Sequence, residues 1–172
     1  MHGKGKFIYQ NGSVFVGEFE KGTMNGYGEF KGEDGVVFKG NYVEGLTDGY
    51  GELFEPDIGT YTGEFKKGKY NGKGKHVSVN GRVYEGEFEN GLWNGKGILF
   101  TEDGDEYIGE FKKGQVHGYG FLKWANGDTF EGQFLYFRAN GKGPCIIGER
   151  IGKCVYDGGE LLEFIERPEN EI

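Results

Sequence analysis

The stretch YTGEFKKGKYNGKG, residues 61–74, brings glycine, lysine and aromatic side chains close together. Glycine beside lysine could form a loop that grips phosphate through its backbone amides. Lysine beside aromatic rings could instead bind nucleic acid, because phosphates attract the charges and bases stack on the rings. The rest of the sequence decides between these chemistries and a purely structural role.

Composition limits the partners and the compartment. The 172 residues carry a formal net charge of −8, which argues against general binding to DNA, RNA or anionic lipid. Cys145 and Cys154 are the only cysteines, which favours a reducing, cytoplasmic compartment, although the two could form one late disulfide. We predict no metal and no cofactor, because a zinc site would need two more ligands nearby. The first residues lack the apolar run of a signal peptide.

A repeat of 23 residues organises the chain. Each copy begins aromatic-x-glycine-x-aromatic, and a G-x-G pair follows later in the copy. A phosphate-binding loop occurs once, between a strand and a helix, so a pattern that recurs assigns these glycines to the fold. The first aromatic residues of the copies are Phe15, Phe38, Tyr61, Tyr84, Tyr107 and Phe130.

The repeat also explains the residues that resemble catalytic groups. Glutamates recur at one offset, and we expect turn amides or solvent to satisfy them rather than acid–base chemistry; they are Glu18, Glu64, Glu87 and Glu110. His2 and His117 fall in a column otherwise filled by asparagine, which we interpret as a turn position. His76 takes an inward position that Leu or Phe fills elsewhere. We therefore predict no catalytic residue and no enzyme.

The copies YTGEFKKGKYNGKG, YEGEFENGLWNGKG and YIGEFKKGQVHGYG resemble the MORN repeat (membrane occupation and recognition nexus). The resemblance covers residues 2–143. It implies an all-β fold, an elongated single-layer antiparallel β-meander of tandem β-hairpins, twisted and curved into a groove. The residues predict the same hairpins, because alternating positions of a strand share a face and an aromatic ring from the adjoining strand can cover a glycine.

Turn chemistry sets the ends of each predicted hairpin. We assign the segment x-x-G-x-x-N-G to one turn, and an Asn-Gly or Asp-Gly pair to the other. Two departures stand out: Pro56 should make one closing turn irregular, and Phe137 replaces the mid-turn glycine of the other copies. No stretch has a helical period.

The predicted organisation has three parts: a half repeat over residues 1–14, six repeats over 15–152, and a cap with an acidic tail over 153–172. The cap would protect the last strand of the array. The first strand is less protected, so its edge could accept a strand from another chain, which would allow self-association.

Two sets of residues are predicted to bind a protein partner. The first-position aromatics would line a groove that holds a helical or extended peptide, with packing alone as the alternative. A second set clusters apolar side chains along one hairpin edge, where we expect a contact surface: Met24, Leu46, Tyr70, Trp93 and Val116.

The charge distribution suggests an alternative to a protein partner. Residues 61–83 carry six basic and one acidic side chain, whereas residues 84–106 carry one basic and seven acidic. The basic copy could contact anionic lipid, or the two bands could stabilise each other. The candidate anion contacts are Lys66, Lys67, Lys69, Lys73 and Lys75.

The resemblance implies a non-catalytic scaffold for protein partners in the cytoskeleton or cilium. The passage GQFLYFRANGKGPCIIGE is similar to the end of radial spoke head repeats. Two alternatives remain: a membrane tether that binds phosphoinositides, as in junctophilins and plant phosphatidylinositol phosphate kinases, and an accessory module of an enzyme. We expect no nucleic-acid partner.

Overall fold

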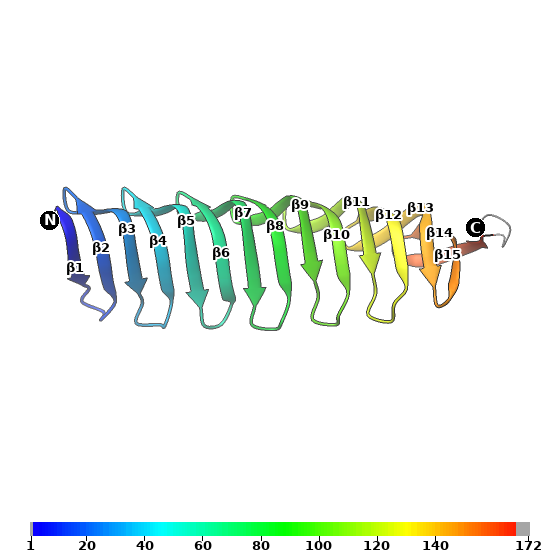
Figure 1. Cartoon of the computed structure of the whole chain (residues 1–172), viewed down its shortest axis with the longest axis horizontal. Coiled ribbons are helices and arrows are strands. Elements are labelled where there is room, and N and C mark those ends of the chain that lie inside the picture. The colour runs from blue at the N-terminus through cyan, green and yellow to red at the C-terminus, as the bar shows by residue number, and fades with distance from the viewer. Residues whose placement is uncertain (1, 168–172) are drawn as a thin grey trace. The chain divides into compact units, whose positions relative to one another are not determined.

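The computed structural model describes residues 2–167. It has two compact units, Met1–Leu92 and Trp93–Ile172, each of which is described by itself. In both units the described residues form strands joined by turns, and no helix occurs among residues 2–167 (Figure 1). The described part of the chain therefore contains no helix that could cross a membrane.

The first unit is one antiparallel sheet whose strands pair in chain order. Its strands are β1 (Gly3–Ile8), β2 (Val14–Glu20), β3 (Thr23–Lys31), β4 (Val37–Val43), β5 (Leu46–Glu55), β6 (Gly59–Lys66), β7 (Lys69–Ser78) and β8 (Val83–Glu89).

The second unit follows the same plan, and its strands also pair in chain order. Its strands are β9 (Leu92–Phe100), which begins at the last residue of the first unit, β10 (Glu106–Lys112), β11 (Gln115–Lys123), β12 (Thr129–Leu135), β13 (Arg138–Ile147), β14 (Arg150–Asp157) and β15 (Glu160–Glu166). The predicted all-β antiparallel meander of hairpins is confirmed.

The segment predicted as a cap continues the meander. Strands β14 and β15 pair as a further hairpin, and the acidic tail, residues 168–172, lies outside the described residues. A disulfide joins Cys145 of β13 to Cys154 of β14, with 5.8 Å between the Cα atoms. The late bridge that the sequence left open is thus present.

Five of the aromatic rings at the first position each cover two glycines: Phe15, Phe38, Tyr61, Tyr107 and Phe130. Phe15 is fully buried, and a Cβ atom on Gly28, in the paired strand, would lie 2.3 Å from its Cζ atom. A Cβ atom on Gly17, in the ring's own strand, would lie 2.6 Å from the same atom. The predicted cover of a glycine by a ring from the adjoining strand is thus found at Gly28, and the ring also covers a glycine of its own strand.

The covered rings also contact one another edge to face. Within the first unit, Phe15 lies 5.2 Å from Phe19 and 5.1 Å from Tyr42, measured between ring centroids. The same zigzag recurs in the second unit, where Tyr107 lies 5.3 Å from Phe111 and 5.0 Å from Phe134. Such pairs contribute about 0.5–1.5 kcal/mol beyond the burial of their area. One continuous row of rings therefore holds each unit's hairpins together.

Short two-residue turns close one end of the hairpins. In the β2–β3 turn, Lys21 has φ 51° and Gly22 has φ 88°, and Glu20 pairs with Thr23. Two left-handed residues in succession define a type I′ turn, whose twist suits a hairpin. Lysine is a costly first residue for such a turn, whereas the Asn90-Gly91 turn uses the favoured pair. The predicted long turn was therefore too long.

The second half of that predicted turn belongs to the following strand. Between Gly17↔Gly28 and Phe19↔Met24 the register shifts, because residues 25–27 of β3 bulge opposite Glu18. Gly26, with φ 100°, makes this bulge. The Asn residues and His117 that precede such glycines are strand residues and not turn residues, whereas His2 lies just before β1.

Longer turns close the other end, and most of them have the predicted chemistry. In the β1–β2 turn, Gly12 has φ 88° and the Asn11 side chain accepts a hydrogen bond from the Ser13 amide at 3.1 Å. The turn with Pro56 is irregular, as predicted, since its left-handed residue is the displaced Gly59 with φ 131°.

Replacing Phe137 with glycine should stabilise the protein. Tyr136 and Phe137 form the short β12–β13 turn with φ 52° and 63°, and Phe137 is 46% exposed. Relief of the left-handed backbone, about 1–2 kcal/mol, exceeds the entropy that glycine adds to the unfolded chain, about 0.5–1 kcal/mol. We expect a higher urea midpoint for Phe137→Gly. The reverse change, Gly22→Phe, is the control. It should lower the midpoint, because phenylalanine is strained in the left-handed backbone of this turn. No steric clash adds to this effect, since no atom lies within 4 Å of the new Cβ. A lower midpoint for Phe137→Gly would contradict the prediction.

The substitution Gly28→Ala tests the ring-over-glycine contact. The new methyl group overlaps the Phe15 ring, so we expect a loss of about 1–3 kcal/mol in the free energy of unfolding. In a Phe15→Leu background the loss should be smaller, because the shorter side chain leaves the methyl group more room. Urea unfolding of the single and double variants measures the coupling. An equal loss in both backgrounds would show that the ring does not set the requirement for glycine.

Candidate functional site

The inner face, which we define as the face with the buried rings, forms a groove in the first unit. Its floor consists of the aromatics at the first and fifth positions of the copies in β2, β4 and β6, all of which are buried. Phe38, Tyr42 and Phe65 are among them. One wall stands near the long turns and the other near the short turns. The facing wall residues are 15 residues apart in sequence: Tyr9 and Met24, Gly32 and Thr47, and Glu55 and Tyr70.

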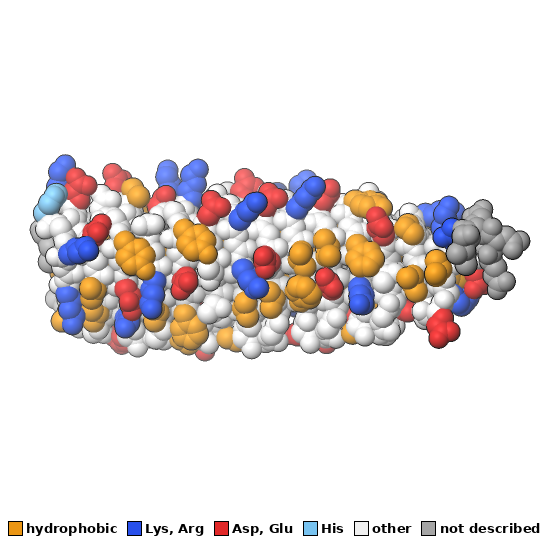
Figure 2. Space-filling view, in the orientation of Figure 1, with side chains coloured by type: hydrophobic (Ala, Val, Ile, Leu, Met, Phe, Trp, Pro, Cys, Tyr) orange, Lys and Arg blue, Asp and Glu red, His pale blue; other side chains and the backbone are white. Residues whose placement is uncertain are grey.

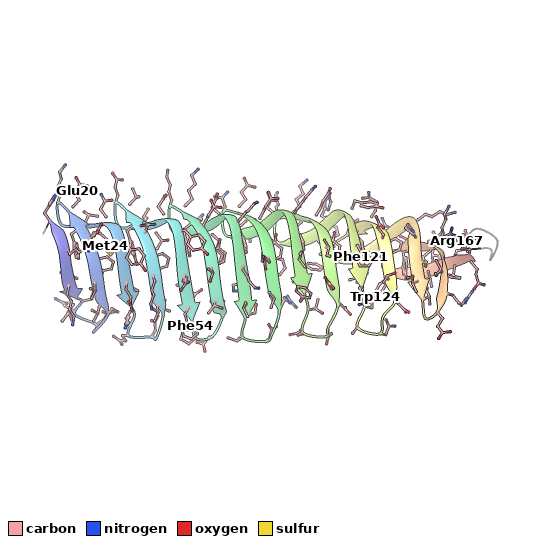
Figure 3. All side chains as sticks on the ribbon, viewed as in Figure 1. Glu20, Met24, Phe54, Phe121, Trp124 and Arg167 are labelled. Atoms are coloured by element: carbon pink, nitrogen blue, oxygen red, sulfur yellow. A yellow bond between two sulfur atoms is a disulfide. The ribbon has the colours of Figure 1, made fainter. Side chains whose placement is uncertain are left out.

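Two of these three wall pairs bridge the groove. The Tyr9 hydroxyl donates a weak hydrogen bond to the Met24 sulfur at 3.9 Å. The Tyr70 hydroxyl donates to Glu55 Oε2 at 3.2 Å. Met24, labelled in Figure 3, lies near the start of β3.

The middle pair forms no bridge, because Gly32 has no side chain and Thr47, which lines the groove, has a short one. A chamber of about 550 Å³ opens there between the two bridges. It is mainly apolar, and Glu55 is the only acidic residue among those that line it. Its lining includes Tyr9, Met24, Phe30, Val36, Phe38, Tyr42, Thr47, Leu53, Glu55, Phe65, Lys69 and Tyr70.

Two ionisable side chains near Glu55 are perturbed. Burial and the nearby Glu55 carboxylate raise the pKa of Tyr70, so its hydroxyl stays protonated as a donor. Burial lowers the pKa of His76 below 6.5, against the opposing pull of Glu55. His76 Nδ1 lies 3.3 Å from Ser78 Oγ. Tyr70 and His76, the two perturbed groups near this carboxylate, are thus neutral at neutral pH.

The predicted groove aromatics lie on the floor. Phe15, Phe38, Tyr61 and Tyr84 are at most 4% exposed in the first unit, and Tyr107 and Phe130 are equally buried in the second. Their rings pack on glycines and on one another, so only the part of the floor under the chamber can meet a ligand.

The predicted apolar edge is only partly on the inner face. Met24 and Tyr70 are half-buried wall residues. Leu46 is 50% exposed and pairs with Val43, and the residue that matches Met24 in this copy is Thr47. Among the members in the second unit, Val116 is 2% exposed, and the Trp93 ring lies 5.9 Å from that of Phe111.

The predicted lysine cluster divides into two groups. Lys66, Lys67 and Lys69 are exposed at the β6–β7 turn, where Lys67 is a left-handed residue. Lys73 and Lys75 lie on the outer face, and Lys75 pairs with Glu85 at 3.3 Å. Figure 2 shows basic and acidic side chains interspersed with apolar ones on the face that it presents.

The recurring glutamates accept hydrogen bonds from backbone amides. Glu64 Oε1 accepts from the Lys73 amide at 3.0 Å, and Glu110 Oε2 from the Tyr119 amide at 3.4 Å. Both amides belong to strand bulges rather than to the predicted turns, and these carboxylates stabilise the backbone there. Among residues 2–167, no group of three or more His, Cys, Asp or Glu side chains is placed to hold a metal ion.

Sequence reasoning missed four residues that line the chamber: Tyr9, Thr47, Leu53 and Glu55. The available signal was the 15-residue spacing between facing walls, but the bulge must be known before this spacing can be recognised. Tyr9 and Glu55 also lie at strand ends, next to turns that a sequence reading treats as connections.

Comparison with known proteins places the fold. A family model of the MORN repeat matches residues 1–14, 15–37, 38–54, 61–81, 84–106 and 107–129. The TCP10 domain of Danio rerio CPAP, solved with a peptide of Danio rerio STIL, is similar with a TM-score of 0.51 and 12% identity, over 94% of this chain and 73% of that chain. The SAS-4 (dCPAP) TCP domain of Drosophila melanogaster, solved with a proline-rich motif of Ana2 (dSTIL), has a TM-score of 0.48 and 10% identity. This match covers 90% of this chain and 89% of that chain.

Identities this low show likeness of fold alone. No curated protein matches the chain. The MORN repeat itself indicates a protein-interaction module. Because the repeat model matches well over half of the residues, in copies whose boundaries follow the observed hairpins, the chain belongs to the MORN-repeat family.

Proposed function

We propose that the chain is a non-catalytic scaffold whose groove in the first unit holds a segment of a protein partner, in a cytoskeletal or ciliary structure. The chamber between the Tyr9–Met24 and Glu55–Tyr70 bridges carries this proposal. Its size falls in the range of about 300–1,000 Å³ that is typical of binding sites. Its lining combines the short Thr47 side chain with Phe38, Tyr42 and Phe65 of the aromatic floor.

The backbone supports a preformed site. Each short-turn glycine donates its amide to the wall residue of the preceding copy: Gly45 to the Met24 carbonyl at 2.9 Å, and Gly68 to the Thr47 carbonyl at 2.9 Å. These bonds tie the short-turn wall together from one hairpin to the next. A rigid wall reduces the ordering cost of binding, so a modest apolar contact can yield useful affinity.

The partner is a protein segment, helical or extended, because the groove is lined by rings and long enough to meet several side chains. Aromatic and aliphatic residues that enter such hollows dominate the energy of many interfaces. The TCP10 domain of Danio rerio CPAP, a protein of similar fold, was solved with a partner's peptide. The cytoskeletal or ciliary setting is proposed for this chain by analogy with other proteins of its family.

A photo-crosslinking residue in place of Val36 should capture the partner. Val36 lines the chamber, whereas its neighbour Val37 lines a separate hollow on the outer face, and both are half-buried. We expect a defined adduct from position 36 and none from position 37 when the labelled protein is expressed in its own cells. Mass spectrometry of the adduct identifies the captured segment.

A groove-filling variant supplies the control. Thr47→Trp should abolish the adduct from position 36, because tryptophan occupies the matching position at Trp93 and would close the gap. The adduct should also remain in the detergent-resistant pellet with tubulin. Equal adducts from both positions, or none from position 36, would overturn the groove scaffold. Release of the adduct with membranes would overturn the cytoskeletal setting.

A further inference from the structure

We propose that the chamber recognises an arginine side chain of the bound segment, with Glu55 as its ion-pair partner and the wall and floor rings as its stacking surface. This inference rests on the proposed function, because it names the chemistry of the segment that the groove holds. Its evidence comes from the position of Glu55 in the repeat, its bonding and the rings around it.

Glu55 is not a recurring residue of the fold. The matching positions of the other copies hold Tyr9, Gly32, Ser78, Thr101, Trp124 and Ile147, none of which is charged. The recurring glutamates, such as Glu64, accept bulge amides and thus have a structural role. Glu55 has no such amide, so the repeat does not account for a carboxylate in this wall.

The carboxylate has an unused oxygen. Glu55 Oε2 accepts the Tyr70 hydroxyl, and Oε1 makes no hydrogen bond or ion pair with any residue in the range 2–167. Lys69 lines the same chamber but forms no ion pair with Glu55 within the described residues. His76 lies near enough to feel the charge, and its lowered pKa leaves it neutral at neutral pH. A half-buried carboxylate without a cation favours a ligand that supplies one.

The rings around Glu55 select the kind of cation. The Tyr70 ring stacks on Tyr61 with 3.8 Å between centroids and 13° between planes, which holds it beside the carboxylate. Its edge-to-face contact with Phe65, at 5.5 Å, further restrains it. A planar guanidinium can stack on such a ring and donate two parallel hydrogen bonds to a carboxylate, whereas an ammonium acts as a point charge. Arginine therefore fits this corner better than lysine.

The chamber's remaining volume is apolar. The walls and floor beyond Glu55 include Met24, Phe30 and Leu53, and the chamber of about 550 Å³ exceeds the need of one side chain. An apolar residue beside the arginine would fill it. The recognised element is thus an arginine with an apolar neighbour, in a partner segment whose basic character complements a chain of net charge −8.

A blocked dipeptide tests this chemistry without the partner. Met24 lines the chamber and is one of 2 methionines, so its labelled methyl group is a local NMR reporter. We expect acetyl-Arg-Leu-amide to shift the Met24 signal saturably in the millimolar range. Acetyl-citrulline-Leu-amide, a neutral analogue of nearly the same shape, should bind about tenfold more weakly. Equal binding of the two probes, or no shift with the arginine probe, would overturn the inference.

The variant Glu55→Gln should remove the preference. Glutamine can still accept the Tyr70 hydrogen bond, so the wall should persist while the charge is lost. We expect the arginine dipeptide to bind this variant about tenfold more weakly, and the citrulline dipeptide to bind as before. Glu52→Gln, on the outer face of the same strand, is the matched control and should leave both affinities unchanged. Unchanged preference in Glu55→Gln would contradict the role of Glu55.

The two proposals can fail separately. If the residue at position 36 captures a partner but the arginine probe shows no advantage, the groove scaffold stands and the arginine inference falls. If the dipeptide preference depends on Glu55 but position 36 captures no protein, the chamber is a cation site and the scaffold proposal falls.

Discussion

The contact of one aromatic ring with two glycines is the constraint on which each unit depends. A single sheet has no second layer to cover its apolar face, so the rings must lie flat on the backbone itself. Glycine is required beneath them because a Cβ atom on Gly28 or Gly74 would enter the Phe15 or Tyr61 ring. The edge-to-face row then joins neighbouring hairpins, as in other repeat proteins whose copies contact only their neighbours.

The same arrangement creates the candidate site. Because the rings already pack on glycine and on each other, they leave little surface for a ligand. Access depends instead on the wall residues above them, which the repeat leaves free to vary. Tyr9–Met24 and Glu55–Tyr70 bridge the groove, and the short Thr47 side chain lines the chamber between them. A scaffold of this kind can change its partner through its walls while its floor stays constant.

Much of the fold followed from residue types and spacing. The hairpins, the Asn-Gly turns and the irregular Pro56 turn were predictable, because each reflects local backbone preference. The bulge at Gly26 was not, since a glycine in a strand and one in a turn look alike in sequence. Leu46 was misplaced by one position in the repeat, because the 23-residue period that relates Met24 to Tyr70 passes through Thr47.

The sequence by itself determined the family, the all-β class and the glycines that the rings require, because the 23-residue period repeats these features in every copy. Only the tertiary structure decided which rings remain accessible and that Glu55 faces Tyr70 across the groove. These are relations between residues of different hairpins, set by register and by the height of side chains on facing walls. No single copy of the repeat contains them, so they appear only when neighbouring hairpins are brought together.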